Sequence, residues 1–166
     1  FAFSICRIEP ENNLHIILEA FSNLDSPHLV MVGNWNNSEY GRVLRERYAA
    51  FKQLLLLDPI YDLGKLKALR SRARFYVHGH SAGGTNPSLV EAMHFGKPVL
   101  AFDCSYNRRT TEDKALFFGD SKALQQLVKS LDDTVSKMVG LDMIEIAQRR
   151  YTWEKIASQY FALLDA

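Results

Sequence analysis

Short apolar runs alternate with more polar segments along nearly the whole chain. These strand-like runs lie at Phe1–Cys6, His28–Gly33, Gln53–Leu57, Phe75–Val77 and Val99–Phe102, with a weaker one at Ala115–Phe118. Continuous apolar strands of this kind suit a parallel sheet that is buried on both faces. The pattern therefore predicts a layered protein with a central sheet.

The segments between the runs carry apolar residues at helical spacing. The predicted helices have stripes at Leu14–Leu24, Leu63–Leu69, Leu124–Leu131 and Trp153–Leu164, and a further helix covers Asp132–Arg150. We expect Asp62 and Ser121 to cap two of them, a break at Gly140, and the greatest flexibility at Asn34–Tyr40. Strands alternating with helices predict an α/β fold in which a Rossmann-like parallel sheet carries helices on both faces.

Composition narrows the class of protein. The chain has 166 residues, is 47% hydrophobic and 23% charged, and carries a net charge of +1. These values suit one domain of ordinary size and give no electrostatic case for nucleic acid. No apolar run approaches the ~20 residues that span a bilayer. Cys6 and Cys104 fit reduced thiols better than a disulfide framework. Because Phe1 already lies in an apparent strand, we expect the chain to be part of a longer polypeptide.

The segment Phe75–Phe102 holds the densest candidate chemistry. It reads as a buried strand, a glycine-bearing loop, a short helix and a second buried strand. Gly83 and Gly84 let the backbone approach a ligand with no Cβ in the way. A loop that leads into a helix start offers free backbone N–H groups to an anion. The loop is therefore a candidate phosphate site.

The short helix after this loop adds a second kind of contact. Thr85 or Asn86 can cap it, Pro87 suits its first turn, and Gly96 ends it. Glu91 falls about one turn inside, where a carboxylate can accept hydrogen bonds from two sugar hydroxyls. Phosphate and hydroxyl contacts together predict a binding site for a sugar nucleotide.

The predicted topology gathers further polar residues at the same edge. Ligands of open parallel sheets bind outside the carboxyl ends of the strands. The segments expected at that edge are Arg7, Gly33–Trp35, Pro59–Tyr61, His78–Asn86 and Asp103–Arg109.

Four motifs in one order resemble a known family. They are SICRIEPENNLHIILEAF, LVMVGNW, the long stretch from DPIYDLGKL to GKPVLAFD, and RRYTWEKIASQYFALL. Together they resemble the C-terminal, donor-binding domain of GT-B glycosyltransferases of the family 4 (group 1) type, over essentially residues 1–166. RIEPENN and HGHSAGGTNPSLVEAM look most like bacterial rhamnosyltransferases.

The resemblance implies one half of a retaining, metal-independent hexosyltransferase. Such an enzyme transfers rhamnose or another hexose from a nucleotide diphosphate sugar to a glycan or lipid-linked acceptor in polysaccharide biosynthesis. It implies no cofactor, no metal and no nucleic acid. It also implies a cytoplasmic enzyme, with peripheral association at the inner face of the membrane left open. An N-terminal acceptor domain would lie outside this chain, so we expect this chain to bind donor weakly and to transfer nothing.

The resemblance also implies residue roles. Arg7 matches the arginine that reaches the donor diphosphate and stabilises the leaving group, the one catalytic role implied here. Glu91 matches the second glutamate of a paired motif, which binds the ribose. The remaining implied contacts are those of Gly84, Thr85, Asn86 and Ser88 with phosphate and donor sugar, and those of Ile60 and Tyr61 with the base.

Two positions depart from the family pattern. Asn12 stands where a lysine is usual, and Gly83 stands where the first glutamate of the pair usually contacts the donor sugar. The candidates to supply the missing contacts are His78, His80, Asn107, Arg108 and Arg109, of which we select His80 and Arg108 as substrate-binding residues.

Alternatives remain at this point. The domain could belong to a sugar-nucleotide epimerase on the same plan, or be a non-catalytic module for assembly or regulation. At single residues, the two glycines could form a simple turn, Glu91 could only stabilise the helix dipole, and Arg7 could pair with a surface carboxylate. A dinucleotide-binding domain is disfavoured, because no Gly-x-Gly-x-x-Gly follows the first strand. His78 and His80 lack a third ligand with metal-like spacing.

Overall fold

The computed structural model describes residues 1–164 and contains one six-stranded, wholly parallel sheet. The strands are β1 (Ala2–Ile5), β2 (Leu29–Val32), β3 (Leu54–Leu57), β4 (Phe75–His78), β5 (Val99–Phe102) and β6 (Leu116–Phe118). Their order across the sheet is β3-β2-β1-β4-β5-β6. Five of these strands lie within the predicted runs, and β4 extends one residue beyond its run. The predicted Rossmann-like α/β fold is therefore confirmed.

Helices connect the strands in sequence. They are the 3₁₀ turn η1 (Pro10–Asn12), α1 (Leu14–Ser22), α2 (Glu39–Tyr48), α3 (Leu63–Arg72), α4 (Pro87–Met93), α5 (Ser105–Thr110), α6 (Ser121–Ser130), α7 (Asp133–Arg150) and α8 (Trp153–Leu164).

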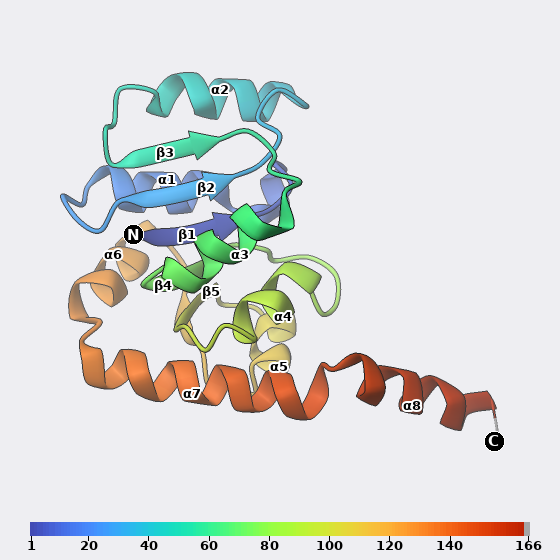
Figure 1. Cartoon of the computed structure of the whole chain (residues 1–166). Helices are drawn as coiled ribbons and strands as arrows, with labels where there is room; N and C mark the ends of the chain where they lie inside the picture. The colour runs from blue at the N-terminus through green and yellow to red at the C-terminus, as the bar shows by residue number, and fades with distance from the viewer. Residues whose placement is uncertain (165–166) are drawn as a thin grey trace.

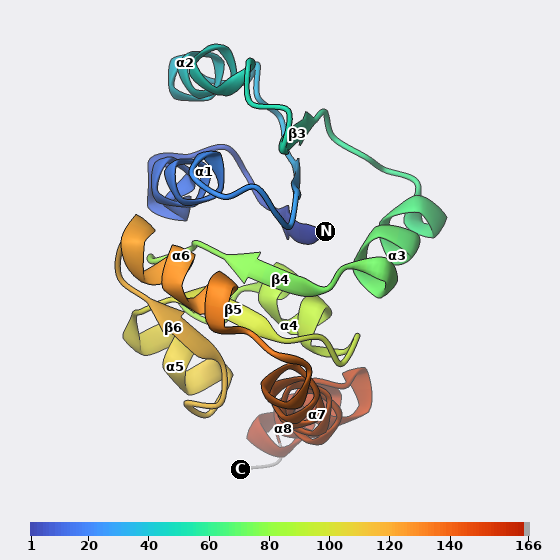
Figure 2. The same cartoon turned by 90° about the vertical axis from the view of Figure 1, so that its left-hand side faces the viewer.

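Two hydrophobic cores lie on opposite faces of the sheet. Side chains alternate along a strand, so that Ala2 of β1 joins one core and its neighbour Phe3 joins the other. Helices α1, α2 and α6 cover the first face, whereas α4, α7 and the half-buried Leu69 of α3 pack on the second. Figure 2 shows these two helical layers on either side of the strands. The sheet is thus buried on both faces.

The strand order creates a switch point between β1 and β4. The chain runs outward from β1 to β2 and β3, then crosses back to β4 on the other side of β1. Helix α1 leaves β1 toward one face and α4 follows β4 on the other. In Figure 1 the arrows of β1, β2 and β3 point the same way. At that end the loops after β1 and β4 meet, where Ser81 donates to the Glu11 carbonyl oxygen. Ligands of such sheets bind in the crevice at this point.

Helix α2 begins at Glu39, at the end of the segment expected to be most flexible, and its cap Ser38 accepts a hydrogen bond from the Gly41 amide at 3.1 Å. The expected flexibility of Asn34–Tyr40 stays a prediction. Two other local predictions were wrong. Asp120, and not Ser121, caps α6 by accepting from the Ala123 amide at 2.8 Å. The expected stripe on α3 buries no residue, and Leu63 is 80% exposed. Asp62 does cap α3, as predicted.

The last two helices also differ from expectation. Helix α7 runs through Gly140 without the predicted break, because this glycine is where the helix backbone meets Gly96. Helix α8 buries none of its residues, and Trp153 is 83% exposed. Figure 1 shows α8 projecting away from the sheet. Within the described residues, only the start of its apolar stripe, at Trp153 and the half-buried Ile156, lies beside Pro87 and Val90 of α4.

Candidate functional site

Asn12 ties the loop after β1 to the loop after β4. Its Nδ2 donates to the Arg7 carbonyl oxygen at 2.8 Å, and its Oδ1 lies 2.8 Å from Nδ1 of His80. Only 4% of Asn12 is exposed. Both the amide and the hydroxyl of Ser81 donate to the Glu11 carbonyl oxygen at 2.9 Å. The two loops at the switch point therefore form one hydrogen-bonded unit.

This unit requires close backbone packing at Gly79. A Cβ on Gly79 would lie 2.1 Å from the Asn12 carbonyl oxygen and 2.8 Å from Cδ1 of Ile17. Asn13, with a left-handed φ of 49°, donates from Nδ2 to the Gly79 carbonyl oxygen at 2.9 Å. Only glycine lets the two loops approach this closely.

Arg7 projects from this unit with most of its side chain exposed. Its Nε lies 3.6 Å from the Glu9 carboxylate, a loose surface pair that costs little to break. The neighbouring Cys6 is half-buried, and desolvation together with Glu9 raises the pKa of its thiol to about 12, which disfavours the reactive thiolate. The guanidinium of Arg7 is the accessible charge of the β1 loop.

The glycine loop is open and its helix is capped. Gly83 has a φ of +82°, in the left-handed region that favours glycine, and a Cβ on Gly84 would meet no atom within 4 Å. Asn86 caps α4, accepting a hydrogen bond from the Ser88 amide at 2.9 Å. Thr85 is exposed and makes no cap. Gly83, Gly84, Thr85, Asn86 and Ser88 thus lie together beside the switch point.

Glu91 lies about one turn into α4, in contact with α3. Nη2 of Arg70 donates to its Oε2, so that an ion pair joins the two helices. The Arg70 side chain is 10% exposed and the Glu91 side chain is 58% exposed. The carboxylate faces a groove of about 280 Å³ that Leu66, Arg70 and His94 also line. This pairing could not be predicted from the sequence, because 21 residues separate the two partners.

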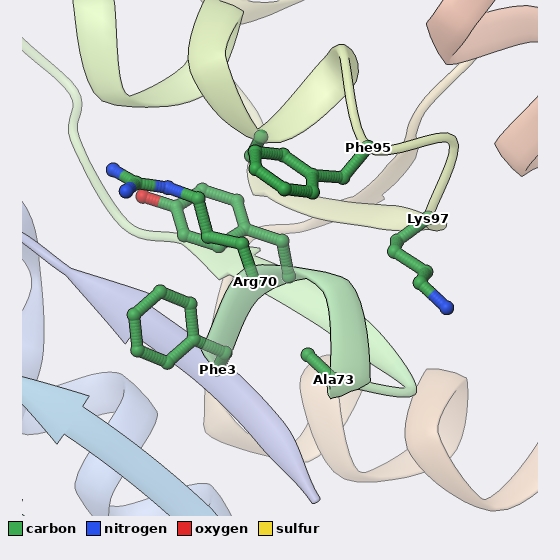
Figure 3. Close-up of a pocket in the computed structure, with 7 residues that line it drawn as sticks. Phe3, Arg70, Ala73, Phe95 and Lys97 are labelled. Carbon is green, nitrogen blue, oxygen red and sulfur yellow. The ribbon is translucent and has the colours of Figure 1, made fainter. Parts of the chain in front are cut away.

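The stem of Arg70 lies against an apolar wall. A small cavity of about 10 Å³ beside it is lined by Phe3, Arg70, Ala73, Tyr76, Ala92, Phe95 and Lys97. In the view of Figure 3, Arg70 lies between the rings of Phe3 and Phe95. Its Nε is buried and finds no hydrogen-bond partner among the described residues. The wall holds the guanidinium in the direction of Glu91.

The candidates for base contact occupy the connection between β3 and α3. Tyr61 is 87% exposed, and Ile60 is half-buried against the core on the α4 face. They precede the helix that carries Arg70, on the same side of the sheet as Glu91. Ile60, Tyr61 and Glu91 thus belong to segments on the face of the sheet that α4 covers, whereas Arg7 and the glycine loop follow the neighbouring strands β1 and β4.

Arg108 is engaged within its own loop. It donates to both carboxylate oxygens of Asp103 at 2.6 and 2.8 Å and to Asp113 at 2.9 Å, and it stacks 4.3 Å from the Phe117 ring centroid. These contacts raise the pKa of Arg108, and the guanidinium lowers the pKa of Asp103. The structure does not bring Arg108 to the glycine loop.

Neither Asn107 nor His78 is exposed to a ligand. Asn107 is buried and donates from Nδ2 to the carbonyl oxygens of His80 and Phe102, both at 2.8 Å. His78 is buried in β4, and desolvation, with His80 nearby, lowers its pKa to about 3. His78 is therefore neutral and structural. His80 is the half-buried member of the pair, with its ring beside the glycine loop.

Metal sites and membrane-spanning helices are two further features to consider. In residues 1–164, no three side chains among His, Cys, Asp and Glu gather as a metal site would require. None of the helices in the same range is long and apolar enough to cross a membrane.

The fold is that of glycosyltransferases with the GT-B architecture. Sucrose-phosphate synthase from Thermosynechococcus elongatus superimposes with a TM-score of 0.85 at 22% identity, covering 99% of this chain and 44% of that one. HepE from Anabaena, solved with UDP-glucose, gives 0.82 at 19% identity and covers 99% of this chain and 48% of that chain. The C-terminal domain of a glycosyl transferase group 1 family protein from Francisella tularensis gives 0.73 at 13% identity, with coverage of 92% and 87%.

Similarity in sequence assigns the chain to one family within this fold. The family model for glycosyl transferases group 1 matches residues 1–149, and the chain belongs to this family. It is 29% identical over 161 residues to the phosphatidyl-myo-inositol mannosyltransferase of Mycobacterium leprae, a match that covers 91% of this chain. The chain spans 42% of the length of that relative. The predicted family is therefore confirmed; the finer rhamnosyltransferase resemblance is not.

Proposed function

We propose that this chain binds the nucleotide diphosphate sugar donor of a group 1 glycosyltransferase. The observation that carries the proposal is the arrangement at the switch point. There the exposed Arg7 and the open loop at Gly83 and Gly84 belong to one hydrogen-bonded unit. A guanidinium and free backbone amides are groups that hold a diphosphate. The UDP-glucose complex of HepE, a protein of the same fold, is consistent with such a donor.

Each part of the donor has a proposed partner. Arg7 and the glycine loop, with Thr85, Asn86 and Ser88, contact the diphosphate and the sugar. Glu91, oriented by Arg70, accepts hydrogen bonds from the ribose hydroxyls, and Ile60 and Tyr61 lie along the base. Arg108 is not included, because its guanidinium is already bonded to Asp103 and Asp113.

The mechanism follows from these roles. As the bond between the sugar and the diphosphate breaks, negative charge grows on the leaving diphosphate, and Arg7 stabilises that charge. The proposed reaction is metal-independent and retains the configuration of the sugar, which is rhamnose or another hexose. The acceptor, a glycan or a lipid-linked glycan, would be held by a further domain of a longer polypeptide, so this chain alone transfers nothing. We place the whole enzyme in the cytoplasm.

Titration with nucleoside diphosphates tests the proposal. UDP, GDP, ADP and dTDP are added to the isotope-labelled chain, and amide shifts are followed by NMR. We expect one nucleotide to shift the amides of Arg7, Gly83–Glu91 and Ile60–Tyr61. Arg7→Ala should weaken this nucleotide about 10- to 100-fold, the effect of losing a charge-assisted hydrogen bond.

Arg72→Ala is the matched control. Arg72 is an exposed arginine in the last turn of α3, at the opposite end of the strands, and its loss should leave affinity unchanged. EDTA should likewise leave affinity unchanged. The proposal fails if no nucleotide shifts these amides at millimolar concentration, or if the two arginine variants weaken binding equally.

A further inference from the structure

The hydrogen bonds of Asn12 fix which nitrogen of His80 carries the proton. Nδ2 of Asn12 donates to the Arg7 carbonyl oxygen at 2.8 Å, so Oδ1 is the atom that faces His80. The reverse orientation of the amide would place two acceptor oxygens against each other at that distance. Oδ1 can only accept, and therefore Nδ1 of His80 must donate across the 2.8 Å contact. A neutral His80 then has its lone pair on Nε2.

That lone pair borders the open glycine loop. A Cβ on Gly83 would lie 3.9 Å from Nε2, the only atom of residues 1–164 outside the glycine and its neighbours that it would meet within 4 Å. Among the described residues, Nε2 has no hydrogen-bond partner, whereas the His80 carbonyl oxygen is held by Asn107 at 2.8 Å and approached by Sγ of Cys104 at 3.8 Å. Hydrogen bonds thus hold Nδ1 of the ring and the backbone of His80, whereas the acceptor Nε2 lies beside the glycine loop.

A hydrogen-bond acceptor such as the unprotonated Nε2 of His80 favours a ligand group that can donate a hydrogen bond. Phosphate oxygens are themselves acceptors and do not pair with an unprotonated ring nitrogen, whereas a hydroxyl can donate to it. In a donor bound at this loop, the hydroxyls available next to the diphosphate are those of the transferred sugar. We propose that Nε2 of His80 accepts a hydrogen bond from a hydroxyl of the donor sugar, and that Asn12 is the positioning residue that holds this tautomer. This inference rests on the proposed function, because it assumes a nucleotide sugar at the loop.

Two substitutions of His80 test the roles of Nδ1 and Nε2 separately. In His80→Asn the shorter amide can still donate to Asn12, but nothing remains at the Nε2 position. In His80→Gln the longer amide brings an oxygen close to the Nε2 position. The readout is the ratio of affinities within three pairs: UDP with UDP-glucose, GDP with GDP-mannose, and dTDP with dTDP-rhamnose. This ratio isolates the contribution of the sugar from that of the nucleotide.

For one pair we expect the sugar to add affinity in the unmodified chain. His80→Asn should reduce that gain by about 3- to 10-fold, the effect of one lost hydrogen bond, with unchanged affinity for the nucleotide alone. His80→Gln should retain most of the gain and serves as the control for folding. Equal sugar gains in the unmodified chain and His80→Asn, or no gain for any pair, would overturn the inference while the proposed function stands. Binding of no nucleotide at all would overturn both.

A measurement without ligand tests the role of Asn12 directly. Long-range ¹⁵N–¹H correlation at mildly alkaline pH reports which ring nitrogen carries the proton. We expect Nδ1–H for His80, and a mixture of both tautomers in Asn12→Ala, where the fixed acceptor is gone. An Nε2–H tautomer in the unmodified chain would overturn the inference whatever the nucleotide affinity.

Discussion

Arg70 and Glu91 form an ion pair between α3 and α4 in which the two partners differ in exposure. The arginine side chain is 10% exposed, against 58% for the glutamate. Arg70 therefore acts as the fixed partner, held by the apolar wall that includes Phe3 and Phe95, and Glu91 is the partner that faces solvent. One carboxylate oxygen is bonded to Nη2, which leaves the other for a ligand. Through Arg70, α3, a helix with no buried residue, sets the orientation of Glu91.

Arg70→Met should lower nucleotide affinity while leaving the stability of the fold nearly unchanged. Methionine keeps apolar contact with Phe3 and Phe95, and a partly exposed ion pair contributes little, so the free energy of unfolding should change by less than about 1 kcal/mol. Nucleotide affinity should fall several-fold, because the Glu91 carboxylate loses its orientation. Chemical denaturation and titration with the nucleotide measure the two effects.

Lys65→Met is the control for this variant. Lys65 is exposed on the same helix and makes no side-chain hydrogen bond among the described residues, so neither quantity should change. Unchanged nucleotide affinity in Arg70→Met would show that the ion pair is structural only.

Gly84→Ala tests whether a ligand approaches the backbone of the loop. The added Cβ meets no protein atom within 4 Å, and Gly84 does not have a left-handed φ. The free energy of unfolding should therefore change by less than about 0.5 kcal/mol. If a diphosphate lies against the loop, the methyl group occupies its space and affinity should fall about tenfold or more. Gly119→Ala, which also meets nothing within 4 Å, should leave affinity unchanged.

The sheet could be predicted from sequence because each strand is a continuous apolar run. A strand such as Val99–Phe102 packs against a core on both faces, so its residues are apolar at every position and the run can be recognised in the sequence. Helices α2 and α5 were not predicted. Helix α2 packs Leu44, Tyr48 and the half-buried Tyr40 against the core, but charged residues stand between them in the sequence. Helix α5 buries only Asn107 and Thr110, which are polar.

The site could be predicted in its parts but not in its connections. The segments after β1 and β4 were correctly expected at one edge, because parallel strands bring their carboxyl ends together. The sequence does not show that Asn12 bonds to His80, that Arg70 bonds to Glu91, or that Asp103 and Asp113 occupy Arg108. Such contacts depend on side-chain directions that only the packed structure sets.

His78 should make the chain less stable below neutral pH. Burial lowers its pKa from the ordinary 6.5 to about 3, so between these values the unfolded chain binds a proton that the folded chain does not. Stability from this group is complete above about pH 6.5 and is lost as the pH falls. The loss should be on the order of 2 kcal/mol at pH 5. The pKa of Asp103 and of Glu112 is lowered below the ordinary carboxyl range, so their contributions are lost only in stronger acid.

Denaturation at pH 7 and pH 5 measures this effect. In His78→Phe the ring still packs beside Tyr76, whose centroid lies 5.9 Å from that of His78, and nothing titrates. The difference between the two pH values should shrink by the stated amount. His28→Gln, at an exposed histidine, should behave as the unmodified chain does. A pH dependence that persists in His78→Phe would assign the effect to other groups.

Gly140→Ala should destabilise the fold although alanine favours helix. In an open helix the substitution would add about 1 kcal/mol of stability. Here the new Cβ would lie 2.3 Å from the carbonyl oxygen and 3.1 Å from the carbonyl carbon of Gly96, both backbone atoms of the turn that ends α4. Gly96 has a φ of +61°, which leaves that turn little freedom to move. Helix α7 must then shift away from α4, and we expect a net loss of about 1–3 kcal/mol in the free energy of unfolding, measured by chemical denaturation. An increase in stability would mean that α7 and α4 pack loosely here, and the glycine would then have no packing role.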